Sequence, residues 1–240
     1  MSWSDGLILS FDTETTGTDP ETARIVSAAC LWRNALSTPE DRSWLVDPGV
    51  EIPEEATAIH GITNEVAATG MDPAEALPEI VSQFRAALRF GAAVVIYNAP
   101  YDLTVLSREC YRYGVDCDLS ELLVVDPLVI DKAIDPYRKG SRKLVDVAAL
   151  YHVPQEGETH GATADALMAA RLAIRLARLP EIAEMTLPQL HQAQIGWKFT
   201  QSASFEAYLK RKNDALPEEE RQPHQTIARD WPIIGRNPNA

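Results

Sequence analysis

The stretch LILSFDTETTG, residues 7–17, is the part of the sequence from which the fold and the chemistry can be worked out. Its apolar start predicts a β-strand, and Asp12 and Glu14 follow at the end of that strand. Side chains two residues apart in a strand point to the same face, so both carboxylates should face one spot. Two such groups repel each other, and hard divalent cations such as Mg²⁺ or Mn²⁺ prefer oxygen ligands. The strand end is therefore a candidate metal site, the alternative being an exposed acidic strand end before a Thr-Gly turn.

Length and charge limit the class of protein. The chain has 240 residues and a formal net charge of −13. That length fits one domain, or one domain with an appendage. The acidic balance argues against non-specific wrapping of duplex nucleic acid, which needs a basic footprint. An enzyme that acts on phosphates through bound metal is still compatible, because the cations supply positive charge locally.

The sequence also predicts a cytoplasmic location. The three cysteines are odd in number and show no metal-ligand spacing, which is typical of reduced thiols. Residues 1–5 do not resemble a signal peptide, and no apolar run approaches the ~18 residues that a transmembrane helix needs. We therefore expect a cytoplasmic protein without a membrane partner.

The apolar patterns outline a mixed sheet. Residues 24–32 and 42–46 predict two more strands, and the short polar segments between them favour antiparallel pairing. Residues 92–97 and 122–125 predict buried strands that alternate with helices, which favours parallel pairing. Helices are expected at residues 73–90, 103–110, 144–151, 166–172 and 187–209, the last as one or two helices. Residues 48–63 have no clear period, and we expect a loop there with His60 as a turn residue.

Two more groups of polar residues lie where an element begins. Asp102 is at the junction between strand 92–97 and the next helix, where an acid also satisfies free backbone N–H groups. Further on, His160 precedes a helix that Thr163 can cap, which leaves Asp165 in the first turn. Alone, each group is explained by helix capping. Together with the acid pair of the first strand, they should converge where strand ends and helix starts meet, the usual ligand position in α/β sheets.

These segments resemble the three motifs of the DEDD exonuclease superfamily, in its histidine-containing (DEDDh) branch. That branch includes the proofreading epsilon subunit of bacterial DNA polymerase III, RNase T and oligoribonuclease. FDTETTG, residues 11–17, is similar to the first motif, and NAPYD, residues 98–102, to the second. His160, separated by four residues from Asp165, resembles the third motif. The likeness spans roughly residues 6–178, and the ordered set of motifs is far more specific than any one of them.

Two further segments extend the resemblance, and two positions depart from it. IHGIT, residues 59–63, and the helix start at Lys143 are also similar to epsilon-type sequence. Tyr97 replaces the common His before Asn98, and Pro100-Tyr101 replaces a Phe-containing turn. Neither departure removes a carboxylate, so both bear on substrate preference more than on activity.

The resemblance implies a role for each motif residue. Four carboxylates would hold two divalent ions, Mg²⁺ or Mn²⁺, which activate the attacking water and stabilise the leaving oxygen. His160 would act as the general base, a task suited to an imidazole. The fold implied is ribonuclease H-like, a mixed β-sheet flanked by α-helices. The implied metal ligands are Asp12, Glu14, Asp102 and Asp165, and the weaker candidates for holding the terminal nucleotide are Thr15, His60 and Asn98.

The likeness fades after about residue 180. We therefore expect an exonuclease domain at residues 1–180, followed by a helical extension and Pro-rich tail at 181–240. Residues 211–240 are expected to be largely solvated, partly folded back on the domain. The alternative is a segment that binds a partner, and a polymerase or repair protein is the partner class that the resemblance leaves open.

The predicted function is 3′→5′ hydrolysis of single-stranded or frayed DNA ends to nucleoside 5′-monophosphates. An RNA-directed exonuclease is the main rival, because the motifs bind the scissile phosphate and do not report the sugar. A catalytically silent binding module on the same fold is another, although all four acids are present. A haloacid-dehalogenase-type phosphatase also begins with an acid pair, but it normally has Asp at the position of Glu14 and would leave His160 and Asp165 unexplained.

Overall fold

A five-stranded mixed sheet organises the protein. The computed structural model describes residues 2–33, 40–154, 161–223 and 225–235. The strands lie in the order β3-β2-β1-β4-β5. β2 pairs antiparallel with β1 and β3, whereas β4 pairs in parallel with β1 and β5. The predicted α/β class with a mixed sheet is therefore confirmed. The strands are β1 (Ile8–Thr15), β2 (Ile25–Arg33), β3 (Glu40–Leu45), β4 (Ala93–Val95) and β5 (Val124–Val125).

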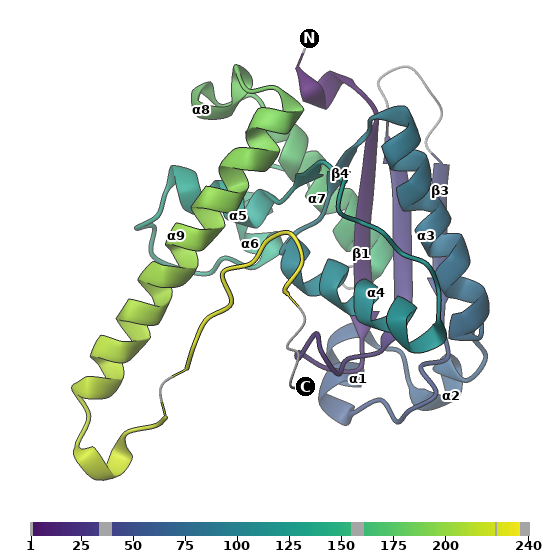
Figure 1. Ribbon diagram of the computed structural model, residues 1–240, viewed down its shortest axis with the longest axis horizontal. Helices are drawn as coiled ribbons and strands as arrows, with labels where there is room; N and C mark the ends of the chain where they lie inside the picture. The colour runs from purple at the N-terminus through teal and green to yellow at the C-terminus, as the bar shows by residue number, and fades with distance from the viewer. Residues whose placement is uncertain (1, 34–39, 155–160, 224, 236–240) are drawn as a thin grey trace.

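Helices cover both faces of the sheet (Figure 1). α3 (Pro73–Phe90) and α4 (Ala99–Tyr113) lie on one face, and α7 (Ala162–Leu176) lies on the other. On the α3 face, the rings of Phe11 and Phe84 meet edge to face with centroids 4.9 Å apart. On the α7 face, the buried Ser10 hydroxyl donates to the Ala166 carbonyl at 2.6 Å. β1 thus contributes alternate side chains to two cores, as its period of two requires.

β1 is longer than its parallel neighbour, and this difference in length creates an open strand edge. The last residues paired between the two strands are Ser10 and Val95. β1 continues to Thr15, so its last five residues, 11–15, have no β4 partner. α4 begins at Ala99 beside that edge. Side chains from the first turns of α4 can therefore reach the backbone of β1.

Several elements differ from the sequence-based expectation. The loop expected at residues 48–63 is wrong, because α1 (Glu54–His60) lies within it and α2 (Asn64–Ala67) follows. α1 ends at Gly61, whose φ of 75° is a left-handed conformation that favours glycine. α5 (Pro127–Ile134), which was not predicted, follows β5 directly. α9 (Leu187–Asp214) is a single helix of 28 residues.

The remaining helical segments are short. Val147 and Ala148 of α6 (Leu144–Leu150) and Ile182 of α8 (Pro180–Ala183) are buried in the apolar cluster on the α7 side of the sheet. Among the helices that the structure describes, none combines the length and the apolar character needed to cross a membrane. The other two short segments are the 3-10 helices η1 (Trp3–Asp5) and η2 (Glu218–Glu220).

The C-terminal region leaves the domain and returns to it. α9 packs against α5 and β5 and then extends beyond the rest of the molecule (Figure 1). The segment after η2 runs back toward α4 (Figure 1). Within it, Trp231 is buried at 6% exposure. Trp231 belongs to the same apolar cluster as Phe11 and Phe84. The tail, expected to be largely solvated and partly folded back on the domain, is thus folded back at Trp231.

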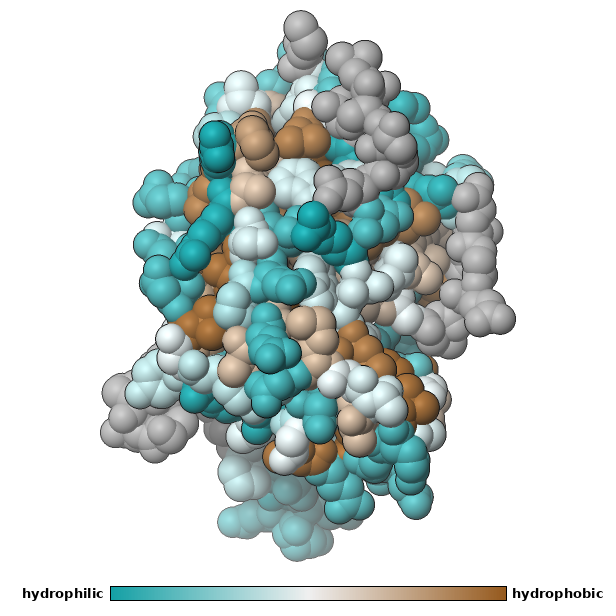
Figure 2. Space-filling model, turned by 90° about the vertical axis from the view of Figure 1, so that its right-hand side faces the viewer, coloured by the Kyte–Doolittle hydropathy of each residue, from teal (hydrophilic) through white to brown (hydrophobic). Residues whose placement is uncertain are grey.

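The described surface on the α3 side mixes hydrophobic and hydrophilic residues (Figure 2). Figure 2 shows that hydrophobic residues on the face toward the viewer form small patches separated by hydrophilic ones. Exposed large apolar side chains of the described chain include Phe90 of α3 and Ile59 of α1. Scattered apolar residues of this kind are normal on a protein surface and do not indicate an interface.

Candidate active site

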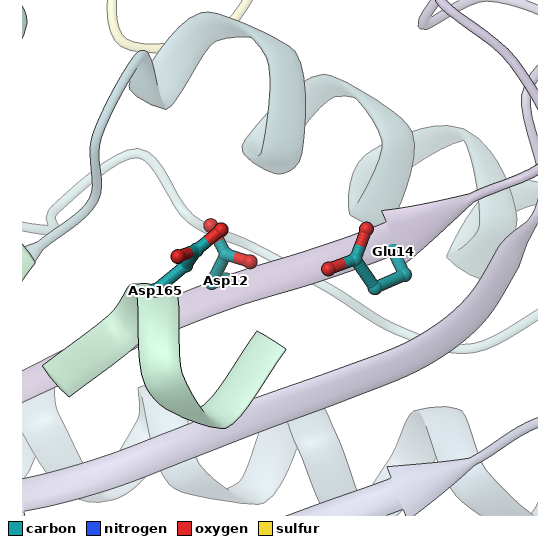
Figure 3. A group of neighbouring side chains, drawn as sticks. All are labelled: Asp12, Glu14 and Asp165. Atoms are coloured by element: carbon teal, nitrogen blue, oxygen red, sulfur yellow. The ribbon is translucent and has the colours of Figure 1, made fainter. Parts of the chain in front are cut away.

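Three carboxylates meet on the α7 face of the sheet, near the C-terminal end of β1. Asp12 and Glu14 come from β1, and Asp165 comes from the first turn of α7. Each offers an oxygen atom within 4.8 Å of the others. Figure 3 shows Asp165 beside Asp12, with Glu14 further along β1. The strand period places the first two on one face, and α7 is fixed to that face by the Ser10–Ala166 hydrogen bond.

The electrostatics of this cluster indicate a cation site. Burial and the neighbouring carboxylates Asp102, Asp165 and Glu14 raise the pKa of Asp12 well above its usual range. Burial, followed by repulsion from Asp165, raises the pKa of Glu14 to about 7. Raised pKa values mean that the protein alone does not compensate the negative charge. A divalent cation bound by these oxygen ligands would supply that compensation, so the residues present fit a metal.

Asp102 approaches the cluster from the open edge of β1. Its Oδ1 atom accepts hydrogen bonds from the Thr13 backbone N–H at 3.0 Å and from the Thr13 hydroxyl at 2.7 Å. The side chain is buried, and burial raises the pKa of Asp102 to about 7 although the Thr13 hydrogen bonds lower it. Asp102 also contributes to the raised pKa of Asp12, so the two charges are close. The four predicted acids therefore gather at one end of β1.

The predicted general base, His160, lies outside the described residues, and the described chain resumes at Gly161. The expected capping of α7 by Thr163 is wrong, because the helix begins at Ala162 with Gly161 as its N-cap and no side-chain cap. Asp165 is nevertheless in the first turn, as predicted.

The three candidates for holding a nucleotide occupy different positions. Thr15 is on the β1 face opposite to Glu14, and its hydroxyl bonds to the Tyr101 hydroxyl and the Gly17 carbonyl. His60, expected to be a turn residue in a loop, is the buried last residue of α1. Burial lowers its pKa, although the Thr15 backbone acts in the opposite direction. Asn98 is exposed at the start of α4 in a left-handed conformation, φ 63°. Thr15 and His60 thus lie together beyond the carboxylates.

One supporting residue was not recognised from the sequence. Asp126, fully buried at the end of β5, accepts hydrogen bonds from the backbone N–H groups of Asn98 and Ala99, both at 3.0 Å. It thereby holds the turn that leads into α4 and Asp102. The Asp-Pro pair after a predicted strand was a visible signal, since Asp before Pro is a common helix N-cap. In the structure Asp126 is the N-cap of α5 and accepts the Leu128 N–H at 3.0 Å.

Comparison with known proteins gives a consistent result. A family model described as exonuclease, of the RNase T type, matches residues 9–173. A protein of Escherichia phage 186 named uncharacterized exonuclease CP81 is 36% identical over 192 residues, covering 73% of this chain and 91% of that protein. The DNA polymerase III subunit epsilon of Rickettsia conorii is 31% identical over 173 residues, covering 69% of this chain and 71% of that protein.

A solved structure shares the fold. E. coli Exonuclease I in complex with a 5cy-dA13 oligonucleotide superimposes with a TM-score of 0.61 at 20% identity. The match covers 81% of this chain but only 43% of Exonuclease I, so the chain spans less than half of that protein. The ribonuclease H-like fold expected from the sequence is therefore confirmed. Because the matched family region runs from β1 to α7 and includes all four gathered acids, the chain belongs to the exonuclease family of metal-dependent hydrolases.

Proposed function

We propose that this protein removes nucleotides from the 3′ end of single-stranded or frayed DNA and releases nucleoside 5′-monophosphates. The observation that carries the proposal is the carboxylate cluster of Asp12, Glu14 and Asp165, with Asp102 beside it, in a chain of the exonuclease family. Residues 1–180 form the exonuclease domain in this proposal, and residues 181–240 form its extension.

The four acids have one task, which is to hold two divalent ions, Mg²⁺ or Mn²⁺. Such ions would offset charge on the scissile phosphate and on the leaving oxygen. Thr13 keeps Asp102 oriented through its two hydrogen bonds, so the carboxylate is fixed before any ion is bound. His160 accepts the proton of the attacking water, since a histidine titrates near neutral pH.

Thr15, His60 and Asn98 form the contact region for the terminal nucleotide in this proposal. Because the Thr15 hydroxyl is bonded to Tyr101, Thr15 would act through its backbone or its methyl group. Asn98 is exposed at the N-cap of α4, where its side chain can reach a phosphate or a sugar. This division leaves the scissile phosphate at the carboxylates.

DNA is favoured over RNA by the kind of proteins that this chain is similar to. E. coli Exonuclease I forms a complex with a dA13 oligonucleotide, and epsilon is by name a subunit of a DNA polymerase. A polymerase or a repair protein is accordingly the partner class proposed for this chain. RNA is the second candidate substrate, and a silent binding module is the third. We propose a cytoplasmic location.

End-labelled oligonucleotides test the proposal directly. Purified protein with Mg²⁺ or Mn²⁺ should degrade single-stranded DNA from the 3′ end, more slowly when RNA or blunt duplex is supplied. A blocked 3′ end should stop degradation, and a blocked 5′ end should not. EDTA in excess, or Asp165→Asn, should remove activity. Full activity in EDTA would contradict metal dependence, and a silent wild-type protein that still binds DNA would favour the binding module.

A further inference from the structure

The C-terminal segment reaches the residues that support the active site. Trp231 is buried with its ring centroid 5.0 Å from that of His191 on α9, and its indole N–H donates to the Asp126 Oδ2 atom at 3.4 Å. The same Oδ2 atom accepts the Ala99 N–H at 3.0 Å. Ala99 is the first residue of α4, and Asp102 follows three residues later, within the first turn. A chain of contacts therefore connects Trp231 to Asp102 through Asp126 and the start of α4.

A second set of contacts joins the same segment to the loop after β1. The Ile234 N–H donates to the Thr104 hydroxyl at 2.9 Å, and the Ile234 carbonyl accepts from the Arg108 guanidinium at 3.0 Å. Arg108 also donates two hydrogen bonds to the carboxylate of Glu21, at 2.7 and 2.8 Å. The segment thus contacts one long face of α4 and, through Arg108, the loop of residues 16–24.

These contacts are built into the interior and are not a loose surface association. Asp126 and Thr104 have no exposed surface, and Arg108 and Trp231 have less than a tenth of theirs. Gln194 of α9 holds the same strand end, because its side-chain oxygen accepts the Asp126 N–H at 2.7 Å. Buried polar groups are costly when their partners are lost, so removing Trp231 should disturb Asp126 in particular.

We propose that residues 230–235 are a positioning element of the exonuclease site, with Trp231 as its anchor. Trp231 holds Asp126, Asp126 holds the first residues of α4, and α4 places Asp102 beside Asp12. The inference rests on the proposed role of Asp102 as a metal ligand. It assigns to the C-terminal segment a role in the chemistry of a site that is distant in the sequence.

Two substitutions in the full-length protein separate positioning from general stability. Trp231→Ala removes both the packing and the N–H donor, whereas Trp231→Phe keeps most of the packing and removes the donor. Ile182→Ala is the matched control, since Ile182 is fully buried on the α7 side, in a different apolar cluster from Trp231. Three quantities are measured: Mn²⁺ affinity by calorimetry, hydrogen exchange of the peptide at residues 96–106, and thermal unfolding.

The proposal makes distinct predictions for these variants. Trp231→Ala should weaken Mn²⁺ binding about tenfold, the lower end of the range for loss of an outer-shell contact to a metal site. Exchange in residues 96–106 should accelerate, while exchange in β1 and β2 stays the same. Trp231→Phe should show a smaller change in the same direction, and it serves as the test if Trp231→Ala does not fold. Ile182→Ala should lower the unfolding temperature without weakening Mn²⁺ binding.

Two results would overturn the positioning role. One is unchanged exchange at residues 96–106 in both Trp231 variants. The other is a Trp231→Ala protein that resembles Ile182→Ala, less stable but with wild-type Mn²⁺ affinity. Neither readout requires nuclease activity. If the wild-type protein degrades no nucleic acid but the Trp231 variants still lose Mn²⁺ affinity, the proposed function fails while the positioning role stands.

Discussion

Metal binding at the carboxylate cluster should depend steeply on pH. Burial holds the pKa of both Glu14 and Asp102 at about 7 in the metal-free protein. A carboxyl with that pKa is about 90% ionised at pH 8 and about 10% ionised at pH 6. Only the ionised form binds a cation, so protonation of each group should lower the metal affinity about tenfold when the pH falls from 8 to 6. Together they predict a decrease of about a hundredfold, or about 2.7 kcal/mol of binding free energy.

The sign follows from the direction of the shifts. Both pKa values are raised, so the acids are still protonated near pH 6 and the ion must displace those protons. Metal affinity should therefore rise with pH through 7, and protons should be released on binding below that pH. Asp12, whose pKa is also raised, acts in the same direction. Acids with ordinary pKa values would instead give an affinity that is almost constant from pH 6 to 8.

Calorimetric titration with Mn²⁺ at constant ionic strength measures this dependence. Titration in two buffers with different ionisation enthalpies counts the protons released. Glu14→Gln should reduce the pH dependence to about tenfold, whereas Glu181→Gln, at an exposed position on α8, should leave it unchanged. A wild-type affinity that changes less than threefold between pH 6 and 8, or that falls as pH rises, would refute the reasoning.

Three further predictions follow from the same geometry. His160→Ala should lower turnover about 10²–10⁴-fold at neutral pH with near-normal Mn²⁺ affinity; loss of the metal instead would make it a ligand. In metal-free protein, the raised pKa of Asp12 contributes stability at low pH, and this stability is lost as pH rises. Asp12→Asn should therefore abolish activity but raise the unfolding temperature at pH 8, by about 2–4 °C for each kcal/mol recovered. Calorimetric scans at pH 5 and 8 check this. Tyr101→Phe should cost about 1 kcal/mol of stability and raise KM, because Tyr101 holds Thr15 and Gly17; unchanged KM would exclude a role in substrate binding.

Local pattern was sufficient to predict the core of the site. The spacing of Asp12 and Glu14 on an apolar strand places both on one face, and the structure confirms this. Asp165 in the first turn of a helix was also predicted correctly. In each case the decisive information lies within a few residues of sequence, because strand and helix periods are local properties.

The parts that failed depend on contacts between distant residues or on very short elements. α1 has only seven residues, too few for an apolar period to stand out, and its end depends on the conformation of Gly61. The hydrogen bonds from Thr13 to Asp102 form because β1 extends beyond the end of β4 and leaves the Thr13 backbone unpaired on that side. The relative lengths of two paired strands cannot be predicted from the local sequence pattern. The Trp231 contact joins residues 105 positions apart. The sequence predicted that the tail is partly folded back on the domain, but it did not indicate which residue docks or where.

The arrangement of supports around Asp102 explains why the distant contacts matter. The cluster is electrostatically unfavourable without a cation, because burial raises the pKa of Asp12, Glu14 and Asp102. Repulsion from neighbouring carboxylates adds to the effect, and for Asp102 that neighbour is Asp126. A single mobile acid would relieve this by turning away into water. The hydrogen bonds from Thr13 keep the Asp102 carboxylate from turning away. Asp126 also keeps it in place, because it fixes the start of α4. The repulsion is therefore kept in the folded protein, where it favours the binding of cations, and the stability needed to keep it comes from the surrounding core and the docked C-terminal segment.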